Sequence, residues 1–485
     1  MIKTAALVAL GCKVNQSESR RWSAELARVG VELVEYGRPA DLYIVNTCTV
    51  TQLGDKSSRQ AIRRAAQANP DGRVVVTGCY ATVDADAVAA LPGVDLVVPN
   101  DDKEALVQRL ADEGLVPMPP EDDPEAWIHP SERPDWITLA PALGRKARAF
   151  VKVQDGCNSH CTYCIVPRAR GPQRSRSIDA IVNEIGVLYN LGYREAVLTG
   201  VQIGAYGSDW DRETRRVRKG SGATLTELVA QILAETRMPR LRISSIQPQD
   251  WPDGFVELWQ DRRMCRHLHV PLQSGNDTVL KRMGRRYRTA HFRTLVERLR
   301  AAMPEVAITA DVMVGFPGET EDEHRASLDF IREMAFFEQH IFRYSSRPGT
   351  SAARLADDVP PESKKRRSEE AHALDAELHA AYRRRFLGRT LVVLWEEPAA
   401  DKLPLPLGGG RGEGSSDAAR HAGMRGALSQ RARGLQVWSG LTDNYLRVYA
   451  AGEALEGELT PVRLDALSGK GIRGEIAWTT ASSVG

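Results

Sequence analysis

The sequence has no long hydrophobic run, because none of its apolar segments approaches the roughly 18 residues that a membrane span needs. It begins MIKTAALVALGC, with one lysine and a very short apolar run, so we expect no signal peptide. The net charge is only +2, which leaves any nucleic-acid binding to local basic patches. We therefore predict a cytoplasmic protein with no membrane partner, and its 485 residues allow two to four domains.

Cysteine is scarce as well, with seven residues in the chain. In a reducing compartment, so few cysteines indicate metal or redox chemistry rather than disulfides. Three of them, Cys157, Cys161 and Cys164, form a C-x3-C-x2-C pattern in a loop that follows a strand-like apolar run. Soft thiolate ligands at this spacing suit an iron–sulfur cluster or zinc. Since four-iron clusters and structural zinc both usually take four protein ligands, this pattern leaves one position open.

The loop by itself leaves two other interpretations open. One is a zinc site that His160 or Cys265 completes, and the other is a set of ordinary buried cysteines. The aromatic Tyr163, which directly precedes the last cysteine of the loop, favours the cluster.

Residues 1–112 alternate strand and helix patterns. We expect strands at residues 5–10, 42–45, 74–76 and 96–98, and helices from about residue 17, at 55–69 and at 84–91. Continuous apolar strands between helices predict a doubly wound parallel sheet. Cys12, Cys48 and Cys79 each follow one of these strands. Ligands of such sheets bind beyond the carboxyl ends of the strands, so we expect the three thiols to converge on one metal centre. The alternative is that cysteine is simply a common small buried residue.

Residues 143–386 continue the alternation after an expected proline-rich linker at 113–142. Six strand segments are expected at 150–153, 196–198, 241–243, 267–270, 307–314 and 341–344. A complete eight-unit barrel needs about 250 residues, so six units over about 200 residues predict a partial, open (β/α)6 barrel of the TIM type. The cysteine loop follows the first strand, which puts it at the C-terminal mouth where barrel active sites lie. A charged helix at residues 363–386 is expected to pack on this barrel.

Two basic groups near these strand ends are candidates for RNA contact, with a solvated basic face as the alternative. The first group consists of Arg168, Arg170, Arg174 and Arg176, and the second of Arg282, Arg285, Arg286, Tyr287 and Arg288. His267 and His269 alternate with apolar residues on a strand, and we expect at least one to be a satisfied core histidine and neither to bind metal.

Residues 387–480 change to short alternating strands at 391–395, 435–438, 445–449 and 459–462. This pattern predicts a small all-β barrel of the kind that often binds single-stranded or looped RNA. A segment near 400–434, rich in glycine and arginine, is predicted to be a flexible insertion within the barrel. The chain is thus α/β, with a small β-barrel at its end.

The two cysteine triplets followed by a small barrel resemble the radical S-adenosylmethionine (SAM) methylthiotransferases, whose C-terminal barrel is called a TRAM domain. The segments LGCKVNQ at 10–16, TGVQIGAYG at 199–207 and GLTDNY at 440–445 are similar to the branch that acts on N6-threonylcarbamoyladenosine in tRNA. The residues around Cys12 differ from those of the branches that act on isopentenyladenosine or a ribosomal protein. Those substrates remain alternatives, as does a non-catalytic, metal-stabilised RNA-binding protein.

The resemblance implies two [4Fe-4S] clusters. One, on Cys157, Cys161 and Cys164, would bind and cleave SAM, and the other, on Cys12, Cys48 and Cys79, would supply sulfur. It implies a tRNA anticodon stem-loop as substrate, modified at C2 of the adenosine next to the anticodon, at position 37. A flavodoxin or ferredoxin is the expected electron donor, while the sequence does not indicate the sulfur donor. The expected SAM contacts beside the cluster are Tyr163, Gly200, Gln202, Ser244 and Gln273.

Overall fold

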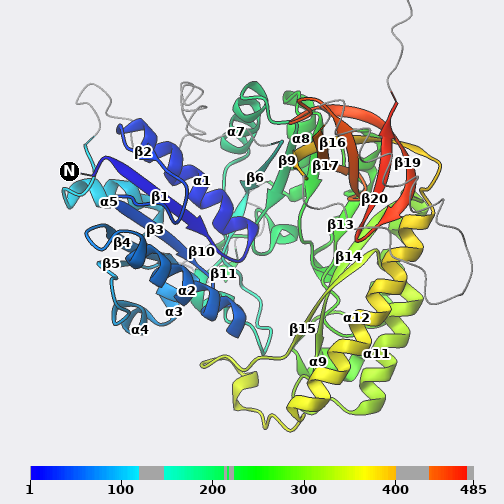
Figure 1. Ribbon diagram of the computed structural model, residues 1–485. Coiled ribbons are helices and arrows are strands. Elements are labelled where there is room, and N and C mark those ends of the chain that lie inside the picture. The colour runs from blue at the N-terminus through cyan, green and yellow to red at the C-terminus, as the bar shows by residue number, and fades with distance from the viewer. Residues whose placement is uncertain (1, 119–146, 212–215, 218–222, 400–435, 478–485) are drawn as a thin grey trace, which may run out of the picture.

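A five-stranded parallel sheet forms the N-terminal part of the computed structural model, which describes residues 2–118, 147–211, 216–217, 223–399 and 436–477 (Figure 1). Its strands are β1 (Thr4–Ala9), β2 (Glu32–Leu33), β3 (Leu42–Thr47), β4 (Arg73–Gly78) and β5 (Leu96–Val98), in the order β2-β1-β3-β4-β5. The helices are α1 (Lys13–Arg28), α2 (Gln52–Ala68), α3 (Cys79–Val83), α4 (Ala85–Ala89), η1 (Lys103–Ala105) and α5 (Leu106–Asp112). Residues of α1 and α5 pack on one face of the sheet and residues of α2 and α4 on the other, so the sheet is doubly wound as expected.

Two helix starts differ from the sequence-based expectation. Helix α1 begins at Lys13 rather than near residue 17, because Gly11 turns the chain sharply after β1 with φ +81°. Helix α2 begins at Gln52, because the Thr51 side chain caps it by accepting a hydrogen bond from the Gly54 amide at 3.0 Å. The first of these shifts makes Cys12 the N-cap residue of α1.

Six parallel strands form the central part. They are β6 (Arg148–Lys152), β9 (Glu195–Thr199), β12 (Arg240–Ile243), β13 (His267–His269), β14 (Ala307–Val314) and β15 (Glu338–Arg343). The first three and the last three pair as two sheets, and bridges such as Ser245 to His269 join the sheets between β12 and β13. Among the described strands, β6 and β15 do not pair with each other, so the barrel is open between them, and α1 packs against β6 at that side. The partial (β/α)6 barrel is therefore confirmed.

Helices surround the barrel strands and cover their apolar faces (Figure 1). They are α6 (Val166–Arg170), α7 (Ile178–Asn190), η4 (Ile203–Ala205), α8 (Leu225–Glu235), η5 (Pro248–Asp250), η6 (Val256–Gln260), α9 (Asp277–Arg282), α10 (Thr289–Ala302), α11 (Glu321–Met334), η7 (Ala352–Arg354) and α12 (Pro361–Arg384). The short strands β7 (Gln154–Asp155) and β8 (Arg174–Ser175) pair beside the cysteine loop, and β10 (Trp210–Asp211) pairs with β11 (Arg216–Val217). Helix α12 lies alongside α11 and β15, as its apolar face predicted. None of the described helices combines the length and the apolar character that crossing a membrane requires.

The C-terminal part is a closed five-stranded barrel, which confirms the expected small β-barrel. Its strands are β16 (Thr390–Pro398), β17 (Gln436–Thr442), β18 (Arg447–Gly452), β19 (Leu459–Ser468) and β20 (Gly471–Ile476). The last strand was not expected, because GIRGEI holds two glycines and only two apolar residues, too few for an alternating pattern. The expected insertion near 400–434 and residues 119–142 of the expected linker lie outside the described part of the chain.

The turn between β17 and β18 packs against the N-terminal ends of the central strands. Tyr445, expected to begin a strand, instead has φ 68°, and its ring stacks on His267 with 4.0 Å between the ring centroids. Asp443 pairs with Arg266 at 2.6 Å. These contacts attach the small barrel to the N-terminal ends of the central strands, opposite the end that carries the cysteine loop.

Candidate metal centres

Cys12, Cys48 and Cys79 meet at the carboxyl edge of the N-terminal sheet. The strand order β2-β1-β3-β4-β5 reverses direction between β1 and β3, and the crevice at such a switch point is where doubly wound sheets bind ligands. Cys12 follows β1, Cys48 follows β3 and Cys79 begins α3 after β4. A Cβ atom on Gly11 would lie 2.6 Å from the Cys48 sulfur, so only glycine allows Cys48 to approach this closely. The structure thus brings the three predicted thiols together around the switch point.

The thiols of this N-terminal triplet affect one another electrostatically. Burial, together with the nearby sulfurs of Cys79 and Cys12, raises the pKa of Cys48 to about 11. Burial likewise raises the pKa of Cys79. The neutral thiols of Cys48 and Cys79 are therefore favoured in the free protein, and a bound metal would have to displace their protons. The Asn100 amide lies 3.8 Å from the Cys79 sulfur, and the Arg170 guanidinium 3.9 Å from the Cys12 sulfur. Such donors favour the thiolate form that metal binding requires.

The loop triplet Cys157, Cys161 and Cys164 lies at the mouth of the central barrel, beyond β6 and β7. Gly156 has φ +72°, and a Cβ atom there would lie 2.1 Å from the Pro172 carbonyl oxygen. The tight turn that results carries Cys157, whose amide bonds to the Gly171 carbonyl oxygen at 3.2 Å. Burial, with the neighbouring sulfurs of Cys161 and Cys157, raises the pKa of Cys164 to about 12. The loop sulfurs thus form a second group, again without a fourth cysteine.

The cysteines of neither group are spaced as closely as the ligands of one zinc ion. A tetrahedral site with Zn–S bonds of about 2.3 Å brings its sulfurs to roughly 3.8 Å from one another. Across the described residues, which include all seven cysteines, no three cysteine sulfurs lie within 4.8 Å of one another. A four-iron cluster spaces its ligands more widely, because each thiolate binds a different iron. Three soft thiolate donors with one position open are the kind of donor set that suits an iron–sulfur cluster.

The two residues considered as a fourth zinc ligand at the loop triplet are Cys265 and His160. Cys265 precedes β13, so it lies at the opposite end of the parallel strands from the loop, fully buried. Its sulfur is 3.8 Å from a Glu195 carboxylate oxygen, and burial raises its pKa to about 12. His160 is exposed. His267 is buried with its Nε2 atom 3.2 Å from the Thr309 hydroxyl, while its Nδ1 atom finds no partner among the described residues, and His269 lies 3.2 Å from Asp311.

Two of the expected SAM contacts have buried polar atoms available. Gln273 and Ser244 follow strands of the central barrel, and their side-chain oxygens Oε1 and Oγ find no hydrogen-bond partner within the described residues. Gln273 also adopts φ 65°, which is rare for a residue with a side chain. Buried polar groups are nearly always satisfied, so two such atoms near the mouth fit a polar ligand.

The other expected SAM contacts have partners within the protein. The Cys157 thiol donates to Gln202 Oε1 at 3.0 Å, and Gln202 in turn donates to Asp250 at 2.8 Å. The Tyr163 hydroxyl accepts a hydrogen bond from Arg285 at 2.5 Å. A Cβ atom on Gly200 would meet Ile203 at 2.6 Å, so packing explains that glycine without a ligand. Contact of these residues with SAM stays a prediction.

Sequence reasoning missed Gln154, which links the cysteine loop to the next strand end. Its amide nitrogen donates to the Gly156 carbonyl oxygen at 2.7 Å, and its amide oxygen accepts from the Val201 and Gln202 backbone at 2.9 and 2.8 Å. Gln154 is fully buried and directly follows the strand-like run at 150–153. A polar residue at that position was the only feature of the sequence that pointed to this structural role.

Most of the side chains proposed for RNA contact are engaged inside the protein, which corrects that prediction for them. Arg170 and Tyr287 are each only 3% exposed. The Tyr287 hydroxyl donates to the Leu272 carbonyl oxygen at 2.6 Å, and Arg282 pairs with Glu323 at 2.6 Å. Arg168 remains exposed. The sequence pattern of basic and aromatic residues did not reveal that buried carboxylates and hydroxyls face them.

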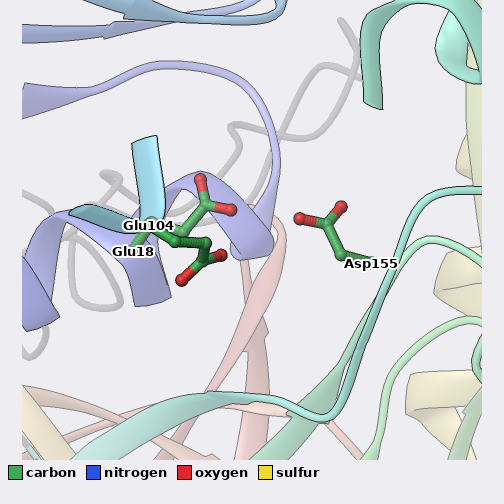
Figure 2. A group of neighbouring side chains, drawn as sticks. All are labelled: Glu18, Glu104 and Asp155. Carbon is green, nitrogen blue, oxygen red and sulfur yellow. The ribbon is translucent and has the colours of Figure 1, made fainter. Parts of the chain in front are cut away.

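Three carboxylates, Glu18, Glu104 and Asp155, meet between the N-terminal sheet and the central barrel. Figure 2 shows them pointing toward one another, and their nearest oxygens all lie within 4.8 Å. Lysines already neutralise them, because Lys103 Nζ lies 2.6 Å from Glu18 and Lys152 Nζ lies 2.6 Å from Glu104. The group is therefore a buried ion-pair network across the interface and not a cation site.

Known proteins match both cysteine-bearing parts of the chain. Residues 151–331 match the radical SAM superfamily, and residues 4–99 match a family described as uncharacterized protein family UPF0004. The threonylcarbamoyladenosine tRNA methylthiotransferase MtaB of Bacillus subtilis is 39% identical over 401 residues, which cover 81% of this chain and 85% of the relative. The protein of the same name from Thermotoga maritima is 34% identical over 81% of this chain and 87% of its own length.

Relatives named for another substrate also match the chain. A tRNA-2-methylthio-N(6)-dimethylallyladenosine synthase of Desulfitobacterium hafniense is 30% identical over 82% of this chain and 87% of its own length. Of solved structures, a radical S-adenosylmethionine methyltransferase from Kitasatospora setae, with cobalamin and a [4Fe-4S] cluster bound, superposes with a TM-score of 0.50. It is 18% identical and covers 73% of this chain and 77% of its own, a likeness of fold alone.

Proposed function

The chain belongs to the radical-SAM tRNA methylthiotransferases, and we propose that it converts N6-threonylcarbamoyladenosine at position 37 of tRNA to its 2-methylthio derivative. The observation that carries this proposal is the pair of three-cysteine groups, each at the carboxyl edge of a parallel sheet and each lacking a fourth protein ligand. Relatives named for threonylcarbamoyladenosine match at 34–39% identity, and relatives named for dimethylallyladenosine match at 30–35%.

We assign a [4Fe-4S] cluster to each group. Cys157, Cys161 and Cys164 would hold the SAM-binding cluster, and Cys12, Cys48 and Cys79 the second. When bound, the two clusters and SAM supply the radical, sulfur and methyl chemistry of the reaction. The protein contributes three thiols beyond the carboxyl ends of each set of parallel strands, glycine turns that place the thiols, and unpaired polar atoms of Ser244 and Gln273 that would orient SAM.

The proposed partners follow from this chemistry. The reaction needs an electron donor, for which a flavodoxin or ferredoxin is suited, and a source of sulfur. Action on tRNA would place the enzyme in the cytoplasm. The closed C-terminal barrel is proposed to bind the RNA, as small barrels of this type often do.

The test is an in vitro assay with anaerobically reconstituted protein, SAM, a reductant and an anticodon stem-loop that carries threonylcarbamoyladenosine. Nucleoside mass spectrometry should show the 2-methylthio product from this RNA. A matched stem-loop with dimethylallyladenosine should give little product. Product from the second RNA alone would reassign the substrate. Protein that contains zinc without sulfide would instead make it a metal-stabilised RNA-binding protein.

A further inference from the structure

Helix α6 connects the two cysteine groups directly. It begins two residues after Cys164, and the carbonyl oxygen of Gly171, directly after its last residue, accepts the Cys157 amide at 3.2 Å. On its other side, the Asn100 amide donates both to the Ala169 carbonyl oxygen at 2.5 Å and toward the Cys79 sulfur at 3.8 Å. One short segment therefore touches residues of both groups.

The last residue of α6, Arg170, extends this connection through its side chain. Its two terminal nitrogens face in different directions. Nη1 donates to Asp155 at 2.8 Å and to Glu18 at 3.3 Å, while Nη2 donates to the Asn15 side chain and approaches the Cys12 sulfur at 3.9 Å. Because the guanidinium is rigid and planar, these contacts fix the orientation of Cys12 relative to Asp155.

Asp155 transmits this orientation to the loop triplet. Its carboxylate accepts the Gly156 amide at 2.8 Å, and Gly156 directly precedes Cys157. A continuous chain of contacts thus runs from the Cys12 sulfur through Arg170 and Asp155 to the backbone of Cys157. The charge of Arg170 is nearer the N-terminal group, since no contact between Arg170 and a sulfur of the loop triplet is found in the described part of the chain.

We propose that Arg170 is a positioning residue that couples the two metal centres: it holds Cys12 in register with the loop triplet and stabilises the reduced form of the N-terminal centre. A cation or donor beside a ligating sulfur favours the state with more negative charge, and this raises the reduction potential of the cluster. The inference rests on the proposed function only in requiring that each group of three cysteines binds a cluster.

The experiment measures reduction potentials by EPR-monitored titration in two cysteine backgrounds. Protein with Cys157, Cys161 and Cys164 changed to alanine retains only the N-terminal cluster, and protein with Cys12, Cys48 and Cys79 changed to alanine retains only the other. Arg170→Met is introduced into each background. Arg168→Met serves as the matched control, because Arg168 lies on the same helix, carries the same charge and is exposed.

We expect Arg170→Met to make the reduction potential of the N-terminal cluster more negative and to leave the potential of the loop cluster unchanged. Arg168→Met should leave the potential of the N-terminal cluster unchanged. In the full chain, Arg170→Met should also broaden the distance distribution between the two reduced clusters in pulsed dipolar EPR. An unchanged N-terminal potential, or equal shifts in both backgrounds, would overturn the proposal.

Arg170→Lys guards against a folding failure of the methionine variant. Lysine can keep the pairing with Glu18 and Asp155, but its single ammonium cannot contact Cys12 and Asn15 at the same time. A smaller negative shift of the N-terminal potential is expected, and a potential equal to that of the parent background would again overturn the proposal. Parent proteins that bind no cluster would instead contradict the proposed function, so the two failures are distinguishable.

Discussion

Replacing Glu18 with glutamine should destabilise the folded chain, because Glu18 is a buried carboxylate that lies within ion-pair distance of three buried cations. Lys103 lies 2.6 Å from it, and Lys152 and Arg170 each lie 3.3 Å from it. Burial alone raises the pKa of Glu18, but these neighbouring charges outweigh burial and lower it from 4.5 to about 2. At 1.36 kcal/mol per pKa unit this corresponds to about 3 kcal/mol, which agrees with the roughly 3–5 kcal/mol that breaking a buried ion pair costs.

Urea unfolding of the cluster-free protein, followed by circular dichroism, measures this change. Because the folded-state pKa is depressed, the stabilisation is fully present above pH 4.5 and is lost as the pH falls toward 2. The difference between the wild-type protein and Glu18→Gln should therefore be largest at neutral pH and shrink in acid. Glu321→Gln is the control, since its ion pair with Arg366 is about half exposed and should be worth less than about 1 kcal/mol. A loss below about 1 kcal/mol for Glu18→Gln at pH 7 would refute the reasoning.

The other predictions concern the thiols and one buried acid. Cys161→Ala should abolish reductive cleavage of SAM to 5′-deoxyadenosine, and activity in that assay would remove the loop triplet from the mechanism. Cys48→Ala should retain some SAM cleavage but form no methylthio product in the nucleoside assay. Gly11→Ala should lower the iron content of reconstituted protein toward that of one cluster, because the added Cβ would lie 2.6 Å from the Cys48 sulfur; unchanged iron would contradict this. Burial outweighs the ion pair with Arg21 and raises the pKa of Glu25 from 4.5 to about 7, so wild-type stability in urea unfolding should fall as the pH rises through that range; a stability that stays constant from pH 4.5 to 7 would contradict this.

The fold was largely readable from local patterns, because buried parallel strands are continuous apolar runs and amphipathic helices repeat every 3.6 residues. Two element boundaries were predicted wrongly because a single residue with a positive φ turns the backbone there. Gly11 starts α1 early, and Tyr445 takes a left-handed turn instead of beginning a strand. The strand β20 was missed because its apolar content is low, although pairing with β18 and β19 closes the barrel.

The candidate metal ligands could also be picked out from the sequence, because thiols are rare and their spacing is distinctive. The surroundings of these thiols were not. Arg170 and Tyr287 looked like a surface for RNA, yet they lie buried against partners from distant parts of the chain. The hydrogen bonds around these thiols join residues that are as far apart in the sequence as Asn15 and Arg170. A pattern of neighbouring residues cannot predict a contact across so many positions.

By itself, the sequence determined which six cysteines form two groups, that each group lacks a fourth thiol, and that each follows strands of a parallel sheet. These are properties of neighbouring residues, and they follow from composition and periodicity. Only the tertiary structure decided that the strand order β2-β1-β3-β4-β5 places Cys12 and Cys48 on either side of a switch point. It alone showed that α6 and Arg170 connect that crevice to the barrel mouth, because side chains far apart in sequence become neighbours only when the two sheets pack together.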